Sequence, residues 1–200
     1  MLTLVIIIIT VLVSIACFKD DRLFDRLSFS AYRVVKHNEW YRLITHGFVH
    51  ADWTHLFVNM FTFYSFGSYM EDLFAHFGGG VWEFSLLYFG GMIVASLHDL
   101  YQYRNDRYYT SIGASGAVSA VLFSFILFNP WEKVYLFAIL PIPGILFGLA
   151  YLLYCQYMAK RSADNVNHNA HFYGAVYGFV LPILLNPQSF HIFWEQLTHG

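Results

Sequence analysis

Charged residues are scarce in this chain of 200 residues. Asp, Glu, Lys and Arg together make up 12% of the sequence, whereas 58% is hydrophobic and 20% is aromatic. A soluble domain carries roughly 25% charged residues. The composition therefore argues against a water-soluble domain and predicts a protein surrounded by lipid.

Basic charge is not in excess either. The 11 Lys and Arg residues are balanced by 13 Asp and Glu residues, which gives a formal net charge of -2. The basic residues do not gather into a stripe that could follow a phosphate backbone. We therefore expect no nucleic-acid partner.

Cysteine is almost absent, since Cys17 and Cys155 are the only two. Both lie in apolar runs, which suits small buried side chains better than a disulfide framework or a zinc site. We expect no metal and no cofactor.

Long apolar runs are what the sequence has instead. A membrane-spanning helix needs about 20 mostly apolar residues, and six stretches come close to this length. They predict an all-α, polytopic membrane protein that forms a single domain over residues 1–200. The predicted spans are residues 2–18, 54–70, 81–97, 111–128, 134–158 and 170–185.

The segments around these spans carry further signals. The first run lacks the positive start and the cleavage site of a signal peptide, so we expect a retained helix. Residues 19–53 are polar and too long for a simple turn, which predicts a structured loop. Pro141 and Pro143 interrupt the fifth predicted span and predict a kink in it.

Two polar clusters fall on predicted spans that begin on the same side of the membrane. Ser115 lies between Gly113 and Gly116 at the start of the fourth span, where small residues are also typical of simple helix packing. His171 shares one helical face with Gly174 and Gly178 on the sixth span. If the glycines bring these two helices together, His171 meets Ser115 and can accept its proton. The alternative is a lone histidine whose hydrogen bonds are satisfied within the bundle.

A third cluster comprises His46, His50, His55 and Asn59. His55 and Asn59 are one helical turn apart and could donate hydrogen bonds to an oxyanion. A metal site at His46 and His50 is the competing interpretation. It ranks second because Asp52 is the only acidic residue nearby.

These clusters, in this order, resemble the rhomboid family of intramembrane serine proteases over nearly the whole chain. The matching residues are Trp40, Arg42, His46, His50, His55, Asn59, the GASG motif at 113–116 and the AHFYG motif at 170–174. The resemblance implies that Ser115 is the nucleophile and His171 the general base, without an acidic third member. His55, Asn59 and the Ser115 N–H would bind the oxyanion. The family pattern gives a structural role to Gly113, Gly116, Gly174, Gly178, Trp40 and Arg42.

The resemblance also implies a biological setting. Substrates would be membrane-embedded proteins that enter between the second and fifth helices, and the protein would lie in the cell (inner) membrane. The family's orientation puts the catalytic side outside. The basic residues oppose this orientation, because all except Lys133 fall on that side.

Ser119 departs from the family pattern. Many members have an aromatic residue at this place, four positions after the serine, where it stacks on the catalytic histidine. Phe172 and Tyr173 point to other faces of the sixth helix, so another residue must orient His171. Two other functions stay open: a proteolytically inactive rhomboid-like binding or chaperone module, and a transporter or channel with intramembrane histidines.

Overall fold

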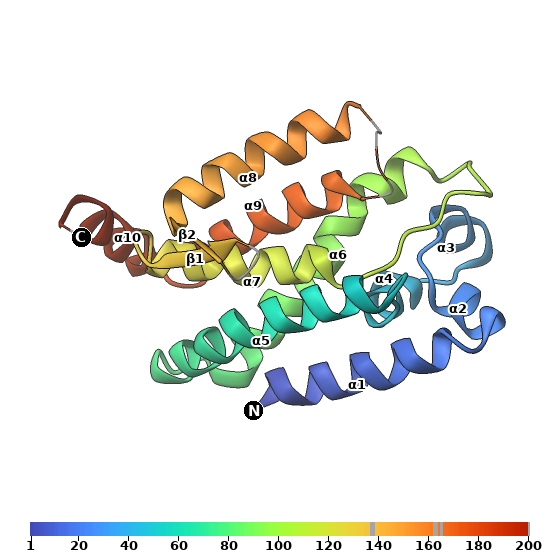
Figure 1. Ribbon diagram of the computed structural model, residues 1–200, viewed down its shortest axis with the longest axis horizontal. Helices are drawn as coiled ribbons and strands as arrows, with labels where there is room; N and C mark the ends of the chain where they lie inside the picture. The colour runs from blue at the N-terminus through green and yellow to red at the C-terminus, as the bar shows by residue number, and fades with distance from the viewer. Residues whose placement is uncertain (137–138, 162–163, 165, 200) are drawn as a thin grey trace.

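The computed structural model describes residues 1–136, 139–161, 164 and 166–199, which form a helical bundle with one short hairpin (Figure 1). The predicted all-α class is confirmed. The helices are α1 (Leu2–Cys17), α2 (Asp21–Leu27), α3 (Ala31–His37), α4 (Arg42–Thr45), the 3-10 helix η1 (His46–Phe48), α5 (Trp53–His76), α6 (Gly80–Gln102), α7 (Ser115–Phe128), α8 (Gly144–Ala159), α9 (His168–Leu185) and α10 (Gln188–His199). Strands β1 (Lys133–Leu136) and β2 (Leu140–Pro143) pair antiparallel.

Helix α7 is the centre of the bundle. Every residue of this helix after Ser115 is buried, and α5, α6, α8, α9 and α10 pack against it. Figure 1 shows α7 running between α5 and α9. A helix that is apolar on all sides belongs in the interior. Ser115 is therefore the first residue of the most deeply buried helix of the bundle.

Helix α1 has the opposite pattern, with small or polar side chains inside and large apolar ones outside. The buried side chains include Thr3, Thr10 and Ser14, and the exposed ones include Leu4, Ile8 and Leu12. Lipid is as apolar as leucine, so such a helix can leave its apolar side outside. On the inner side, the Glu71 carboxylate accepts hydrogen bonds from the Thr3 N–H (2.9 Å) and hydroxyl (2.8 Å), at the positive end of the α1 dipole.

Among the described helices, only α6 is both long and apolar enough to cross a membrane by length and composition. Helices α1, α7 and α8 are apolar but shorter. The six predicted ranges each overlap one helix of the structure, namely α1 and α5 to α9. Six membrane spans therefore remain a prediction.

The predicted helix over residues 134–158 is wrong before Gly144. Residues 133–136 and 140–143 form the paired strands β1 and β2, and α8 begins only at Gly144. Proline has no N–H to donate and its ring clashes with the carbonyl four residues earlier. Pro141 and Pro143 therefore stop a helix instead of kinking it, and Pro143 becomes the residue before α8.

The other boundaries differ less. Helix α7 begins at Ser115, four residues later than the predicted start at residue 111. The delay arises because Ser111 pairs with Phe29 in an isolated bridge and Gly113 has a φ of 106°. Helices α5 and α6 are longer than predicted at both ends. The amphipathic helix α10 was not predicted.

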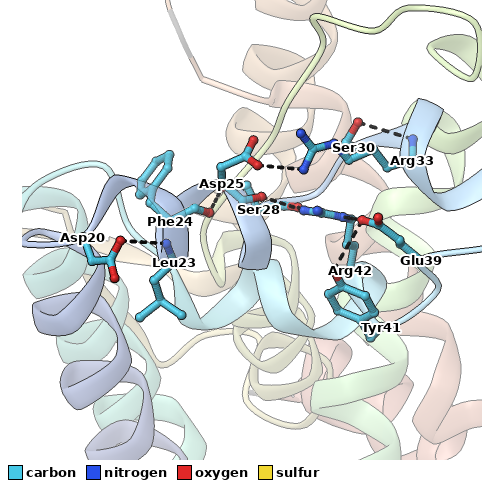
Figure 2. Close-up of polar contacts among 10 residues, drawn as sticks. All are labelled: Asp20, Leu23, Phe24, Asp25, Ser28, Ser30, Arg33, Glu39, Tyr41 and Arg42. Atoms are coloured by element: carbon cyan, nitrogen blue, oxygen red, sulfur yellow. Dashed lines mark hydrogen bonds and ion pairs between the residues drawn. The ribbon is translucent and has the colours of Figure 1, made fainter. Parts of the chain in front are cut away.

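The predicted structured loop contains α2, α3, α4 and η1, and Arg42 links these elements (Figure 2). The Arg42 side chain is 2% exposed. Its Nη1 donates to the carbonyls of Asp25 (2.7 Å) and Ser28 (2.5 Å), and its Nε donates to the Glu39 carboxylate (2.5 Å). Trp40, in contrast, is 53% exposed, as expected for an aromatic anchor at a membrane interface.

Candidate active site

Ser115 is the first residue of α7 and is half-buried. The segment before it is extended and is fixed by a hydrogen bond from the Gly113 N–H to the His46 carbonyl (3.0 Å). Gly113 then turns the chain with its left-handed φ of 106°. Such a backbone conformation is costly for any residue with a Cβ, so the glycine sets the direction in which α7 starts.

The His55 ring lies against this glycine. A Cβ on Gly113 would lie only 2.7 Å from His55 Cε1 and 2.9 Å from Nε2. Asn59 is buried one turn further along α5, where its Nδ2 donates to the His55 carbonyl (2.9 Å). The structure thus brings both predicted oxyanion donors to the end of α5 that faces the start of α7.

Helices α7 and α9 touch through their backbones. A Cβ on Gly174 would overlap the carbonyl of Gly116, and a Cβ on Gly178 would overlap the carbonyl of Ala120. From the first contact to the second, the position moves four residues along both helices in the same direction, so α7 and α9 run parallel and in register. His171 lies one turn before the first contact and is therefore level with the segment that leads into Ser115.

Ser115 and the residue before His171 line the same small cavity. Ser115, Gly116, Ala170 and Asn167 are among its lining residues, and its volume is about 20 Å³, enough for one water molecule. Among the described residues, no hydrogen bond joins Ser115 to His171. The structure thus places both residues at the same end of the paired helices, without a described hydrogen bond between them.

Tyr151 of α8 supplies an aromatic ring beside His171. The two rings are nearly parallel, at 12°, with their centroids 6.2 Å apart. The Tyr151 hydroxyl lies 2.8 Å from Ser119 Oγ in a hydrogen bond. Sequence reasoning missed Tyr151, because one tyrosine in an apolar span has no distinguishing pattern.

Asn167 fixes the start of α9. Its Oδ1 accepts from the Ala170 N–H (3.0 Å), and its Nδ2 donates to Asp99 Oδ2 on α6 (2.5 Å). The Tyr109 hydroxyl donates to the same carboxylate oxygen (2.6 Å). Burial, together with the Asp99 charge, raises the pKa of Tyr109, so its hydroxyl stays protonated and keeps donating.

His46 and His50 bind structural partners. The His46 Nδ1–H donates to the Arg42 carbonyl (3.2 Å), and its Nε2 lies 3.3 Å from Ser96 Oγ. His50 Nδ1 lies 3.0 Å from Ser14 Oγ. The residues that the structure describes include no metal-binding group that contains either histidine, so the competing metal interpretation gains no support.

His46 should make the stability of the protein depend on pH. Burial lowers its pKa from the ordinary 6.5 to about 4, so the unfolded chain binds a proton below pH 6.5 that the folded chain refuses until about pH 4. Stability is therefore present at neutral pH and lost as the pH falls. We expect about 2 kcal/mol less unfolding free energy at pH 5 than at pH 7 from this residue.

Titration with SDS at both pH values, in detergent micelles, measures this difference. The variant His46→Asn should lose less stability between pH 7 and pH 5 than the wild type. A remainder is expected from His50, whose pKa burial lowers to about 3. The exposed His37 provides the control His37→Asn, and an equal loss in all three proteins would contradict the assignment.

A different group of side chains could hold a metal ion. One ligand atom each from Cys155, His168 and His171 lies within 4.8 Å of the others. The sequence predicted no metal, with Cys155 as a small buried side chain. The signal that this prediction passed over is the pair of histidines three positions apart at the start of α9, which places both on one helical face.

Comparisons with known proteins agree on one family. Residues 37–188 match the Rhomboid domain family. "Rhomboid-like protein 11, chloroplastic" from Arabidopsis thaliana is 32% identical over 189 residues, which cover 88% of this chain and 64% of that protein. "Putative rhomboid protease YdcA" from Bacillus subtilis (strain 168) is 31% identical over 156 residues, or 75% of this chain and 69% of that protein. "RHOMBOID-like protein 12, mitochondrial" from Arabidopsis thaliana is 28% identical, with 70% and 45% covered. The matched region is less than two thirds of both plant proteins.

Proposed function

The chain belongs to the rhomboid family of integral membrane proteins, and we propose that it is a serine endopeptidase with Ser115 and His171 as its catalytic dyad. One observation carries the proposal. The backbone contact of α7 with α9 at Gly116 and Gly174 sets the two residues at one end of the bundle. His55 faces the same place from α5.

The first chemical step is attack on the scissile carbonyl. Ser115 Oγ bonds to the carbonyl carbon while its proton moves to the neutral His171 imidazole. The charge that develops on the carbonyl oxygen is met by the Ser115 N–H, which lies in the first turn of α7 and has no partner among the described residues. His55 and Asn59 donate the remaining hydrogen bonds to the oxyanion. To do so, Asn59 Nδ2 must give up its hydrogen bond to the His55 carbonyl.

The second half of the reaction returns the enzyme to its starting state. His171 passes its proton to the leaving amine, and the peptide bond breaks to leave an acyl group on Ser115 Oγ. The cavity beside Ser115 has room for the water that attacks this ester. His171 takes a proton from that water and gives it to Ser115 Oγ as the ester C–Oγ bond breaks, which releases the new carboxylic acid.

We propose transmembrane segments of other proteins as substrates. Helices α5 and α8 correspond to the second and fifth predicted spans, and both present apolar side chains outward. Phe57 and Phe61 on α5 and Leu149 and Leu153 on α8 are more than half exposed. A lipid-facing segment can approach these surfaces without leaving an apolar environment, and the cell (inner) membrane is the proposed location.

Tyr151 acts in this proposal as a positioning residue for His171. Tyr151→Ala should lower kcat by about 10- to 100-fold, because a base that is misplaced by about 1 Å loses that much rate. Tyr151→Phe keeps the ring and should recover most of the rate. An unchanged KM and an unchanged thermal midpoint would separate positioning from folding, whereas an equal loss in both variants would point to the hydroxyl.

Covalent labelling tests the proposed function directly. A fluorophosphonate probe should modify the wild type in detergent, and peptide mass spectrometry should place the adduct on Ser115. His171→Ala should label far more slowly, because nothing then accepts the serine proton. A folded wild type that resists the probe would favour an inactive rhomboid-like binding module. A chain of that kind would need no hydrogen bond between Ser115 and His171.

A further inference from the structure

We propose that Cys155, His168 and His171 form an inhibitory Zn²⁺ site. The metal would bind the His171 imidazole, which is the proposed catalytic base. This inference rests on the proposed function, because inhibition presupposes that His171 is the base. Cys155 lies on α8, and both histidines lie in the first turn of α9. A metal at this place would therefore join two helices as well as block the dyad.

The geometry of the three side chains fits zinc. Zn²⁺ binds thiolate and imidazole in a tetrahedron, where neighbouring ligand atoms lie about 3.5 Å apart. The three candidate atoms lie within 4.8 Å of one another, so side-chain rotations that close each gap by about 1 Å would complete the set. A water molecule can take the fourth position.

The His168 ring supports the proposal independently of the distances. Its side chain is buried, with 5% exposure, and its Nδ1 has no hydrogen-bond partner among the described residues. Its Nε2 lies 3.0 and 3.2 Å from the two oxygens of Asp164. A carboxylate accepts the Nε2–H, which leaves the lone pair on the buried Nδ1.

Asp164 and His168 thus repeat an arrangement that metal sites use. Histidines that bind metals usually donate their second ring N–H to a carboxylate, which fixes the tautomer and strengthens the ligand. Here the carboxylate is on the chain just before α9, and Nδ1 is the His168 ring nitrogen that remains for a metal ion. A buried polar atom without a partner is unfavourable, and a metal ion would satisfy it.

Zinc at this site is incompatible with general-base catalysis. A neutral imidazole has one lone pair, and coordination to the metal uses it. His171 would then have only an N–H on its other nitrogen and could not accept the Ser115 proton. Binding also releases the thiol proton of Cys155 to solvent, because zinc takes the thiolate.

The first test measures metal binding without any catalysis. Ser115→Ala, purified in detergent without a polyhistidine tag, is titrated with Co²⁺, which reports its ligands by its spectrum. We expect one Co²⁺ per chain, a thiolate-to-cobalt band in the near ultraviolet, and displacement by Zn²⁺. The band should vanish when Cys155→Ala is added and persist when the other cysteine is removed by Cys17→Ala. Absence of the band in Ser115→Ala would overturn the site.

The second test measures inhibition, with each variant normalised to its own rate in EDTA. Zn²⁺ should inhibit the wild type and EDTA should reverse this. Asp164→Asn and Cys155→Ala should each raise the half-inhibitory Zn²⁺ concentration about 10- to 100-fold, whereas Cys17→Ala should not. Equal inhibition of all variants would overturn the proposal. If the wild type cleaves nothing, the proposed function fails, and the Co²⁺ spectrum still decides the metal site.

Discussion

Ser115→Ala and His171→Ala should each reduce cleavage of a single-span substrate by about 10⁴-fold or more. The loss is this large because the two residues act on one proton. Without the imidazole, the serine hydroxyl is a weak nucleophile, and without the hydroxyl no acyl intermediate forms. In a serine hydrolase, removing either member costs about as much as removing both, since the oxyanion donors alone give only a residual rate.

The measurement compares purified proteins in detergent, with fragments followed by mass spectrometry. Ser124→Ala is a matched control, because Ser124 lies on the same helix and is fully buried, and its hydroxyl has no hydrogen-bond partner in the part of the chain that the structure describes. His191→Ala on the exposed side of α10 controls for the loss of a histidine. Both controls should keep the wild-type rate. Cleavage that survives in Ser115→Ala would mean that another group is the nucleophile.

The helical period was enough to predict the shared face of His171, Gly174 and Gly178. Spacings of three and seven residues put these positions on one side of any helix, whatever packs against it. The structure adds the partner, which is the backbone of α7 at Gly116 and Ala120. The prediction that Ser115 meets His171 depended on counting spans, and in the structure Ser115 and Ala170, the residue before His171, line one cavity.

The contacts of Tyr151 and the partners of His168 could not be predicted from the sequence, although the spacing of His168 and His171 could. Tyr151 reaches His171 only because α8 packs on α9. The positions of Ser115 and Ser119, one turn apart on α7, do not indicate that a residue of α8 lies beside them. The role of His168 depends on a carboxylate four residues earlier and on a cysteine thirteen residues earlier in another helix. The hairpin was missed for a local reason, since apolar composition outweighed the two prolines in the prediction.

Gly174→Ala should destabilise the protein and abolish most of its activity with a single methyl group. Alanine favours a helix over glycine by about 1 kcal/mol, so the change would be stabilising if there were space. There is none, because the new Cβ would overlap the Gly116 carbonyl, a backbone group that cannot rotate away. Forcing two packed helices apart costs on the order of 3 kcal/mol, so the steric effect wins.

The same displacement would move His171 away from Ser115, since both residues lie within one turn of the contact. We expect kcat/KM to fall at least about 100-fold, in line with a shift of about 1 Å in the reacting groups. Gly148→Ala is the matched control, because a Cβ there would lie 3.4 Å from Phe123 Cε1, an ordinary contact. SDS titration measures the unfolding free energy of both variants, and cleavage assays measure their kcat/KM. If Gly174→Ala proves as stable and as active as Gly148→Ala, the backbone contact of α7 and α9 does not hold the dyad together.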